Sequence, residues 1–191
     1  MILIYLQKNY DLGCSTRSIH DNFYNMINDK KAIVQELEFG YLIHIPTMNV
    51  PHKLLKELVY SFYLSCYRLD IRDGRINITP ENIAVALGLS ASNKNLFSKI
   101  KFQELSEENK KVVRSFQGKT LSQLSTSMME MSVDREKNWL KFKKTFILYI
   151  QMSFLLLTTV NKLSLVHMPP ILHVDTIGEG NWSGHMLNFL I

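Results

Sequence analysis

The sequence predicts a mainly α-helical domain with one small β-hairpin near residues 68–78. Apolar residues recur every three or four positions along most of the chain, which is the spacing of one buried helix face. Helix-capping residues precede several of these stretches, and one short segment combines β-branched residues with a tight-turn pair. Hydrophobic residues make up 46% of the 191 residues, enough for a buried core without disulfides or metals.

The first helix is expected in the N-terminal part of the chain and to end before Gly40. The positions that follow its helical period are Phe23, Met26, Ile27, Lys30, Ile33, Val34 and Leu37. Gly40 is expected to end it in the left-handed conformation, which glycine adopts without a steric penalty. Residues 40–46 are rich in β-branched and aromatic residues and stop at a proline, which predicts a short extended link. We therefore divide the chain into an N-terminal extension with the first helix, residues 1–36, and a helical domain, residues 37–191.

A second helix and the β-hairpin are expected next. Asn49 can cap this helix with its side chain. One face of the helix is lined by Leu54, Leu55, Leu58, Val59 and Phe62. Residues 68–71 and 75–78 flank Asp73 and Gly74, a turn pair that suits positive φ, so these two segments are the predicted strands.

The segment after the hairpin has the signature of a short capped helix. Thr79 is expected to cap it, and Pro80 is expected at the first helical position, where no amide hydrogen is needed. Gly88 is expected to end it. Its buried stripe is predicted to consist of Ile83, Ala84, Ala86 and Leu87.

Two shorter helices are expected in the following stretch. Ser106 can cap the first, two acidic residues stand in its first turn, and Gly118 can end it. Leu121, Leu124 and Met128 stand at helical spacing and predict the second.

The longest helix is expected from about Arg135 to Thr159. Its apolar face, with Phe142 and Phe146, is predicted to be the structural spine of the domain. A last helix is expected to start at Trp182. It is still apolar at Ile191, where no cap or polar tail follows, so we expect the chain to be part of a longer product.

The sequence offers no disulfide framework and no convincing membrane segment. Cys14 and Cys66 are the only cysteines and stand in unrelated contexts, which predicts a reducing compartment. Cys66 is expected to be a small buried thiol. The apolar run Met1–Leu6 is too short for a secretory signal, and we expect a strand or the fringe of the core there. Residues 146–160 are apolar but fall short of the about 20 residues that a span requires, so a buried helix is preferred.

Recognised catalytic and cofactor motifs are absent from the sequence. Neither Gly-x-Gly-x-x-Gly nor Gly-x-x-x-x-Gly-Lys-Ser/Thr occurs. His167, His173, Asp175 and His185 lie in one stretch, but their spacing fits no compact metal-ligand set. We therefore expect no catalytic, cofactor or metal site and no enzymatic activity.

The net charge of +5 permits an acidic partner. The candidate nucleic-acid-binding residues, called the basic strip below, are Lys94, Lys99, Lys101, Lys110, Lys111, Arg114 and Lys119. Phe97 and Phe102 are interleaved with them, and aromatic stacking beside a cationic groove is how single-stranded nucleic acids are bound. Glutamates within the same stretch reduce the expected attraction for phosphate. A nucleic-acid-binding module is therefore an alternative to a protein-interaction module.

Several blocks of the sequence together resemble the plant mobile domain, also called the aminotransferase-like plant mobile domain. The early blocks are Phe-Gly-Tyr-Leu at residues 39–42 and residues 69–89, which contain the hairpin, Thr-Pro-Glu-Asn-Ile and the ending Leu-Gly-Leu. The late blocks are Lys-Phe-Lys-Lys-Thr-Phe-Ile-Leu at residues 141–148 and residues 167–187, which include Asn-Trp-Ser-Gly-His-Met-Leu. The resemblance covers roughly residues 37–191, and it is closest to the legume transposon-associated branch. Leu-Leu-Thr at residues 156–158 departs from the Cys-Pro or Leu-Pro that many relatives carry before the threonine.

The resemblance implies a domain of transposable-element origin, similar to proteins linked to transposon silencing and genome maintenance. It implies a nuclear location, with the cytoplasm as the alternative, no membrane association, and protein partners that include phosphatase-like proteins. Some relatives are fused to a ubiquitin-like-protein-specific cysteine protease domain, so an N-terminal fragment of such a protein is a further alternative. The aminotransferase label is not carried over, because a pyridoxal enzyme needs a Schiff-base lysine and a phosphate cradle, and neither can be assigned in this sequence.

Overall fold

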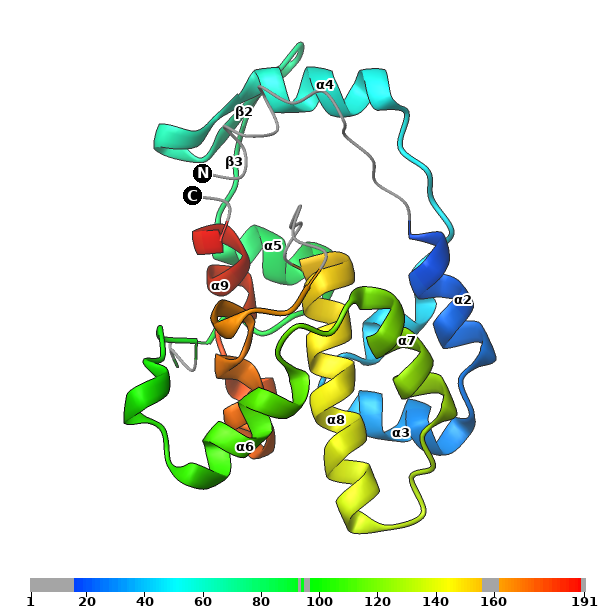
Figure 1. Ribbon diagram of the computed structural model, residues 1–191. Helices are drawn as coiled ribbons and strands as arrows, with labels where there is room; N and C mark the ends of the chain where they lie inside the picture. Colours follow the sequence, from blue (N-terminus) through cyan, green and yellow to red (C-terminus); the bar gives the residue numbers. More distant parts are fainter. Residues whose placement is uncertain (1–15, 93, 95–96, 156–161, 190–191) are drawn as a thin grey trace.

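Helices make up most of the described structure, and a small antiparallel sheet accompanies them (Figure 1). The computed structural model describes residues 16–92, 94, 97–155 and 162–189. This architecture confirms the predicted fold class, mainly α with a hairpin near residues 68–78.

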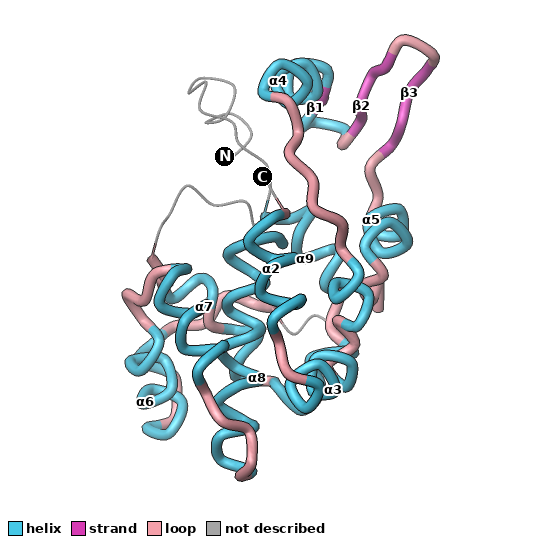
Figure 2. Tube along the Cα trace, turned by 90° about the vertical axis from the view of Figure 1, so that its right-hand side faces the viewer, coloured by secondary structure: helices cyan, strands magenta, loops and turns pink. Residues whose placement is uncertain are grey.

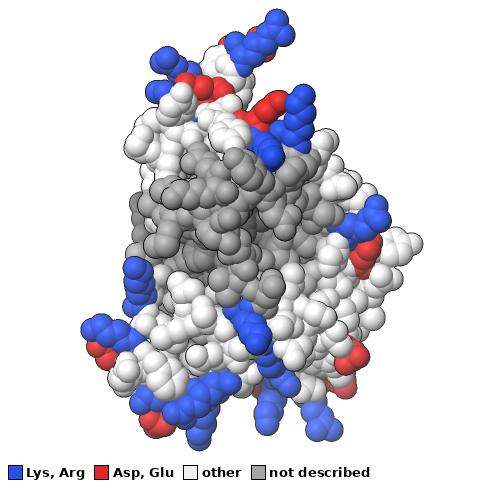
Figure 3. Space-filling view, turned by 45° about the horizontal axis from the view of Figure 1, so that its top comes forward, with Lys and Arg blue, Asp and Glu red and all other residues white. Residues whose placement is uncertain are grey.

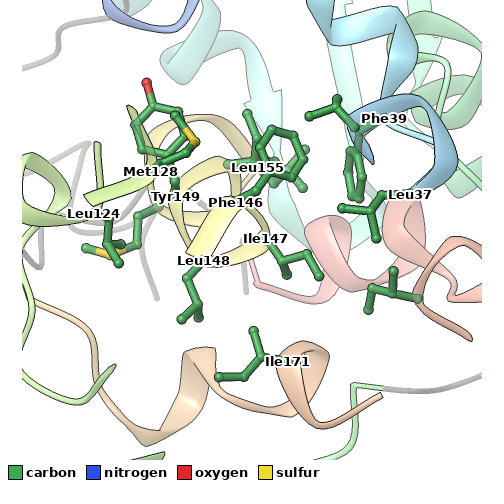
Figure 4. Packing of buried hydrophobic residues seen from close by; sticks show 14 of the residues in the cluster. Leu37, Phe39, Leu124, Met128, Phe146, Ile147, Leu148, Tyr149, Leu155 and Ile171 are labelled. Carbon is green, nitrogen blue, oxygen red and sulfur yellow. The ribbon is translucent and has the colours of Figure 1, made fainter. Parts of the chain in front are cut away.

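The core is organised around α8 (Glu136–Ile150), which continues as a π-helical turn at Gln151–Leu155. Phe142 and Phe146 are fully buried, which confirms the predicted spine as far as residue 155; residues 156–159 lie outside the described part. Side chains from α7 (Leu121–Glu130) pack on one side of α8, and Leu37 and Phe39 lie on the other (Figure 4). Within the described residues, no helix is long and apolar enough to cross a bilayer.

The N-terminal part forms two helices, α2 (Arg17–Asn25) and α3 (Asn28–Glu36), so the prediction of one continuous helix is wrong. The backbone is extended at Met26 and Ile27, with ψ angles of 134° and 155°. Short polar side chains surround this break, and the amide of Asn25 donates to the carbonyl of Asp21 (2.8 Å). Such side chains compete with helical hydrogen bonds and favour helix ends. The apolar period survives the break because both helices turn an apolar face to the same core.

The turn after α3 falls at Glu38, whose φ is 64°, and Gly40 is not left-handed. Gly40 instead begins the 3-10 helix η1 (Gly40–His44), so both the predicted helix end and the predicted extended link are wrong. The reason is the burial of Phe39, which lies between Glu38 and Gly40. Phe39 is 1% exposed, and its amide donates to the carbonyl of Val34, so the chain must reverse before it.

A separate unit follows, and we call residues 52–78 the arm. It consists of α4 (His52–Ser61), β1 (Phe62–Tyr63), the 3-10 turn η2 (Leu64–Cys66), β2 (Arg68–Ile71) and β3 (Gly74–Asn77). The strands pair antiparallel in the order β1-β2-β3, and Figures 1 and 2 show the arm standing away from the helical body. The hairpin is confirmed with a shift of one residue: the turn is Arg72-Asp73, and Gly74, with φ of 151°, pairs with Ile71. Asn49 does not cap α4, because the helix begins only after Pro51.

The caps of α5 (Pro80–Leu87) are those predicted. The hydroxyl of Thr79 accepts from the amide of Asn82 (3.2 Å), Pro80 is the first helical residue, and Gly88 ends the helix with φ of 63°. The prediction that these residues form a buried stripe is wrong, because Ile83, Ala84 and Leu87 are half-buried and Ala86 is exposed. The stripe borders a hollow described below instead of facing the core.

Replacing Thr79 with alanine should cost about 1 kcal/mol of local stability, because the first turn of α5 loses its capping acceptor. Hydrogen exchange of the α5 amides measures this loss directly. The matched control is Thr126→Ala on the exposed face of α7, where no capping bond is lost. Equal protection of the α5 amides in both variants would contradict the capping role.

The C-terminal part packs short helices against the body. Ser106 caps α6 (Glu107–Phe116) as predicted, and Gly118 follows it with φ of 83°. The remaining elements are the 3-10 helices η3 (Phe102–Glu104), η5 (Leu165–His167), η6 (Pro169–Leu172) and η7 (Val174–Glu179), and the helix α9 (Trp182–Phe189). Trp182 begins α9 as predicted and lies in the core with 1% exposure.

Candidate docking surface

The described residues between 43 and 88 include no buried residue. This stretch contains the arm, α5 and their connections. Apolar side chains of the arm are exposed on both the helix and the sheet: Leu54, Leu58, Tyr63, Ile71 and Ile76. Exposed apolar side chains that gather in one region are typical of an interaction surface.

Arginine and tyrosine side chains order the sheet side of the arm. Arg68 lies over the ring of Tyr63 (5.0 Å to the ring centre), and its Nε donates to the carboxylate of Asp70 (2.7 Å). This carboxylate raises the pKa of Arg68 through its hydrogen bond. Arg75 approaches the same carboxylate at 4.0 Å.

A hollow of about 810 Å³ lies below the arm, between η1, the connection at residues 45–48 and α5. Its lining is mainly apolar: Leu42, Ile45, Met48, Ala84, Val85, Ala86, Leu87, Leu89, Ala91 and Phe154, together with Thr16, Tyr41, His44, Pro46 and Gly88. Val85 on its rim is 86% exposed. A cavity of this size and composition is suited to apolar side chains of a ligand or a peptide.

Gly88 and Tyr41 shape the hollow together. A Cβ atom at residue 88 would lie 2.5 Å from the Tyr41 ring, and the φ of 63° at this position also favours glycine. The ring of Tyr41 therefore packs directly on the backbone at the end of α5. It separates the hollow from a smaller one of about 530 Å³ that Gln35, Glu38 and Ser90 help to line.

Thr16 holds the edge of the hollow. Its hydroxyl donates to the carbonyl of Pro46 (2.5 Å) and accepts from the amide of Met48 (2.8 Å), and its own amide donates to the carbonyl of Met48 (3.0 Å). Thr16 is 2% exposed. This clamp joins the start of the described chain to the connection that leads to α4.

The basic strip is spread over several elements, and much of its charge is compensated. Lys94 pairs with Glu179, Lys101 with Glu104 (2.9 Å) and Lys110 with Glu107 (2.8 Å). Arg114 lies over the ring of Phe102 and Lys119 over that of Phe116, at 5.2 and 5.0 Å, while Lys99 and Lys111 are exposed. On the face shown in Figure 3, acidic side chains lie beside several of the Lys and Arg groups.

The two aromatic residues of the strip are not free to stack on bases, which corrects the expectation from sequence. Phe97 is 9% exposed, with its ring centre 4.6 Å from that of Trp182, and Phe102 is half-buried below Arg114. The sequence placed them correctly among the lysines. It could not show that their rings are used for packing.

The predicted histidines do not converge on one site. His173 and Asp175 are exposed, whereas His167 is buried and His185 half-buried. The amide Nε2 of Gln151 lies 3.3 Å from Nε2 of His185, and burial, with a contribution from His167, lowers the pKa of His185 to about 4. Among the described residues, no group of three or more His, Cys, Asp or Glu side chains is placed to hold a metal ion.

The two cysteines give no nucleophilic site in the described structure. Cys66 is exposed, so its prediction as a buried thiol is wrong. It lies in η2, within the arm, where no core is available to cover it. Cys14 lies outside the described residues.

The family model of a domain of unknown function, DUF8566, matches residues 12–191. The chain belongs to the DUF8566 family. Comparison with curated proteins and with solved structures gave no significant match. The matched range includes the arm, the hollow and Thr16, so the candidate docking surface is part of the DUF8566 domain, whereas the Met1–Leu6 run precedes it.

The sequence did not reveal the contacts that shape the candidate docking surface of this DUF8566 domain. It assigned Gly88 to a helix end, which is confirmed, but not to the contact with Tyr41. It gave no role to Thr16, whose partners lie about thirty positions away in sequence. The only signal available was the clustering of tyrosines and leucines between residues 41 and 63.

Proposed function

We propose that this DUF8566 chain is a non-enzymatic protein-interaction domain, and that the arm and the hollow receive an apolar segment of a partner protein. One observation carries the proposal: residues 43–88 contain exposed apolar side chains but no buried described residue. Exposed apolar groups concentrated in one region mark interaction surfaces more often than single scattered ones do.

The charge of the arm indicates the chemistry of the partner. Residues 52–78 contain Lys53, Lys56, Arg68, Arg72 and Arg75 against Glu57, Asp70 and Asp73. This excess of positive charge favours a partner segment whose apolar residues are flanked by acidic ones.

The resemblance to the plant mobile domain extends the proposal. On that basis the domain has a transposable-element origin, acts in the nucleus and has a phosphatase-like protein among its partners. The alternative of a nucleic-acid-binding module has less support, because Lys94, Lys101 and Lys110 of the strip are paired with glutamates and its aromatic rings are packed. The alternative of a protease-bearing product concerns residues beyond this chain.

Recovery of partners from plant nuclear extract with arm variants tests this function. We expect Leu58→Ser to reduce recovery of specific partners at least about tenfold, which corresponds to about 1.4 kcal/mol of lost apolar contact. The matched control is Leu140→Ser on α8, because Leu58 and Leu140 are 38% and 39% exposed. Extract treated with nuclease separates direct protein binding from binding through nucleic acid.

The proposal is supported by partners that are still recovered after nuclease treatment, are lost with Leu58→Ser and are retained with Leu140→Ser. One of these partners, once purified, must also bind the unmodified chain and Leu140→Ser more tightly than Leu58→Ser. Equal recovery with both variants would overturn it. Recovery that disappears after nuclease treatment would instead favour the nucleic-acid alternative.

A further inference from the structure

We infer that the smaller hollow beside Tyr41 binds an arginine side chain of the partner, whose guanidinium pairs with the carboxylate of Glu38 and stacks on the Tyr41 ring. The inference rests on the proposed function, because it names one residue of the segment that the neighbouring larger hollow receives. Its evidence consists of a carboxylate without an ion pair among the described residues, an exposed aromatic ring, and two glycines that leave room for these side chains.

The two hollows share a wall but differ in charge. Tyr41, His44, Gly88 and Leu89 line both of them. The described lining of the larger hollow contains no Asp, Glu, Lys or Arg. The smaller hollow, of about 530 Å³, adds the carboxylate of Glu38, and its described lining contains no Lys or Arg. A partner segment with apolar side chains in the larger hollow therefore meets one negative charge next to them.

The carboxylate of Glu38 has neither an ion pair nor a hydrogen bond among the residues that the structure describes. Two acidic residues near it in the fold are paired: Glu36 with Lys143 (2.8 Å) and Glu179 with Lys94. Glu38 is exposed, so water solvates its charge in the free chain. A guanidinium that replaces this water forms charge-assisted hydrogen bonds, and two parallel bonds can form to one carboxylate.

The backbone holds Glu38 at the hollow in a conformation that is unusual for glutamate. Its φ of 64° lies in the left-handed region, where glycine is the residue that normally ends a helix. The side chain lies against the backbone of η7, because a Cβ atom at residue 178 would be 2.8 Å from the Cδ atom of Glu38. Gly178 therefore leaves the room that this side chain occupies. A preference for ending the helix does not explain a glutamate at this position, whereas a carboxylate held at the hollow does.

Tyr41 supplies the second contact of the site. Its ring is 73% exposed and packs on the backbone at Gly88, which fixes its place between the two hollows. A cation within about 6 Å of the centre of such a ring is attracted to the ring face. Arginine suits this pair of groups better than lysine does, because its planar guanidinium can stack on a ring and pair with a carboxylate at the same time.

The arm and the smaller hollow together give the partner segment a direction. The arm carries an excess of positive charge, which favours acidic residues in the part of the segment that contacts it. The smaller hollow carries the opposite charge and lies on the other side of Tyr41 from the larger hollow. The expected segment therefore has acidic residues toward the arm, apolar residues in the larger hollow and one arginine beyond Tyr41.

Titration of the ¹⁵N-labelled chain with short peptides tests the site. The probe is acetyl-Leu-Arg-amide, prepared with zero, one or two glycines between its two residues, and its matched control carries citrulline, which has the shape of arginine without the charge. We expect the arginine peptide of the best-fitting length to bind at least about threefold more tightly than its citrulline counterpart, because of the ion pair and the ring contact. The largest chemical-shift changes are expected at residues 35–44 and 88–90. Equal affinity, shifts confined to other residues, or no saturable shift would overturn the inference.

Three variants of the full chain show whether the Glu38 carboxylate is responsible. Glu38→Gln keeps the size of the side chain and removes its charge, whereas Glu130→Gln makes the same change at the exposed end of α7. We expect the preference for arginine over citrulline to disappear in the first and to remain in the second. Gly178→Ala retains the charge but displaces the Glu38 side chain, so it should also reduce the preference. A preference that survives Glu38→Gln or Gly178→Ala, or that is lost in Glu130→Gln as well, would overturn the inference.

The titrations and the partner recovery fail independently. The titrations use no partner protein and no arm variant, so equal affinity for the arginine and citrulline peptides would refute the arginine site and leave the partner-recovery result standing. Equal recovery of partners with Leu58→Ser and Leu140→Ser would refute the proposed function even where the arginine peptide binds beside Tyr41.

Discussion

Replacing Trp182 with alanine is expected to lower the free energy of unfolding by about 3–5 kcal/mol. Most domains are stable by only about 5–15 kcal/mol in total, so this change is expected to bring the chain close to unfolding. Trp182 joins parts of the chain that are far apart in sequence. Its ring centre lies 5.1 Å from that of Phe39 and 4.6 Å from that of Phe97, and its Nε1 donates to the carbonyl of Ile177 (3.0 Å).

The loss has two separable parts. Alanine removes the ring and leaves a cavity between α9 and the N-terminal part of the core, which the surrounding backbone cannot fill. It also removes the indole donor from the carbonyl of Ile177, which keeps only the amide of Gly180 as a donor. Trp182→Phe keeps one aromatic ring but removes the five-membered ring of the indole together with its N–H donor, so it should cost about 1–3 kcal/mol.

Chemical denaturation followed by circular dichroism measures both variants. The control is Trp139→Ala on α8, where the ring is half-buried and lies under the ammonium group of Lys143. Trp139→Ala should lower the free energy of unfolding by about 1–2 kcal/mol, because the ring of Trp139 is only partly buried. If Trp182→Ala lost no more stability than Trp139→Ala, the role of Trp182 as the link between these segments would be wrong.

The ends of α5 and α6 were predictable because their determinants are local. The hydroxyls of Thr79 and Ser106 each accept a hydrogen bond from the amide three residues later, and Gly88 and Gly118 adopt the expected positive φ. Each of these interactions is complete within a few residues of sequence, so a pattern of residue types is sufficient to recognise it.

The burial of each helix was less predictable. The period of apolar residues shows which face of a helix is apolar, but it does not show whether another part of the chain covers that face. The face of α4 with Leu54 and Leu58 has the same pattern as that of α8 with Phe142 and Phe146. The first is exposed and the second is fully buried. Only the path of the chain, which carries α4 away from the body, decides between them (Figure 2).

The candidate docking surface was hidden for a related reason. The contact between Gly88 and Tyr41 and the clamp of Thr16 on Met48 join residues that are distant in sequence. The same holds for Gly40, where the position of the turn was decided by the burial of Phe39 in the core. Such tertiary contacts override local preference, and a single sequence contains no record of them.

Acidification from pH 7 to pH 4 is expected to lower the free energy of unfolding by about 3 kcal/mol through His185 alone. Burial lowers the pKa of His185 from 6.5 to about 4 in the folded chain, and the charge of His167 acts in the same direction. Between these two values the unfolded chain binds a proton at residue 185 and the folded chain does not, so stability falls as the pH decreases through this window. Above about pH 7 the imidazole is neutral in both states and contributes nothing to the pH dependence.

The surroundings of His185 explain this preference for the neutral ring. Its Nε2 faces the amide nitrogen of Gln151 at 3.3 Å, and its ring centre lies 4.4 Å from that of Phe97. A proton added at Nε2 would meet a donor group instead of an acceptor, and the rings of Phe97 and Trp182 pack beside the imidazole and replace part of its solvation. Protonation is therefore easier after unfolding.

Denaturation curves of the unmodified chain and of His185→Gln between pH 7 and pH 4 isolate this contribution. Carboxylates that titrate over the same range are common to both proteins, so the difference between the two slopes belongs to residue 185. We expect the variant to lose about 3 kcal/mol less than the unmodified chain over this range. His173→Gln, at an exposed position, should retain the steep slope. Identical slopes for the unmodified chain and His185→Gln would show that the imidazole titrates alike in the folded and unfolded chains, and that its contacts with Gln151 and Phe97 do not disfavour the proton.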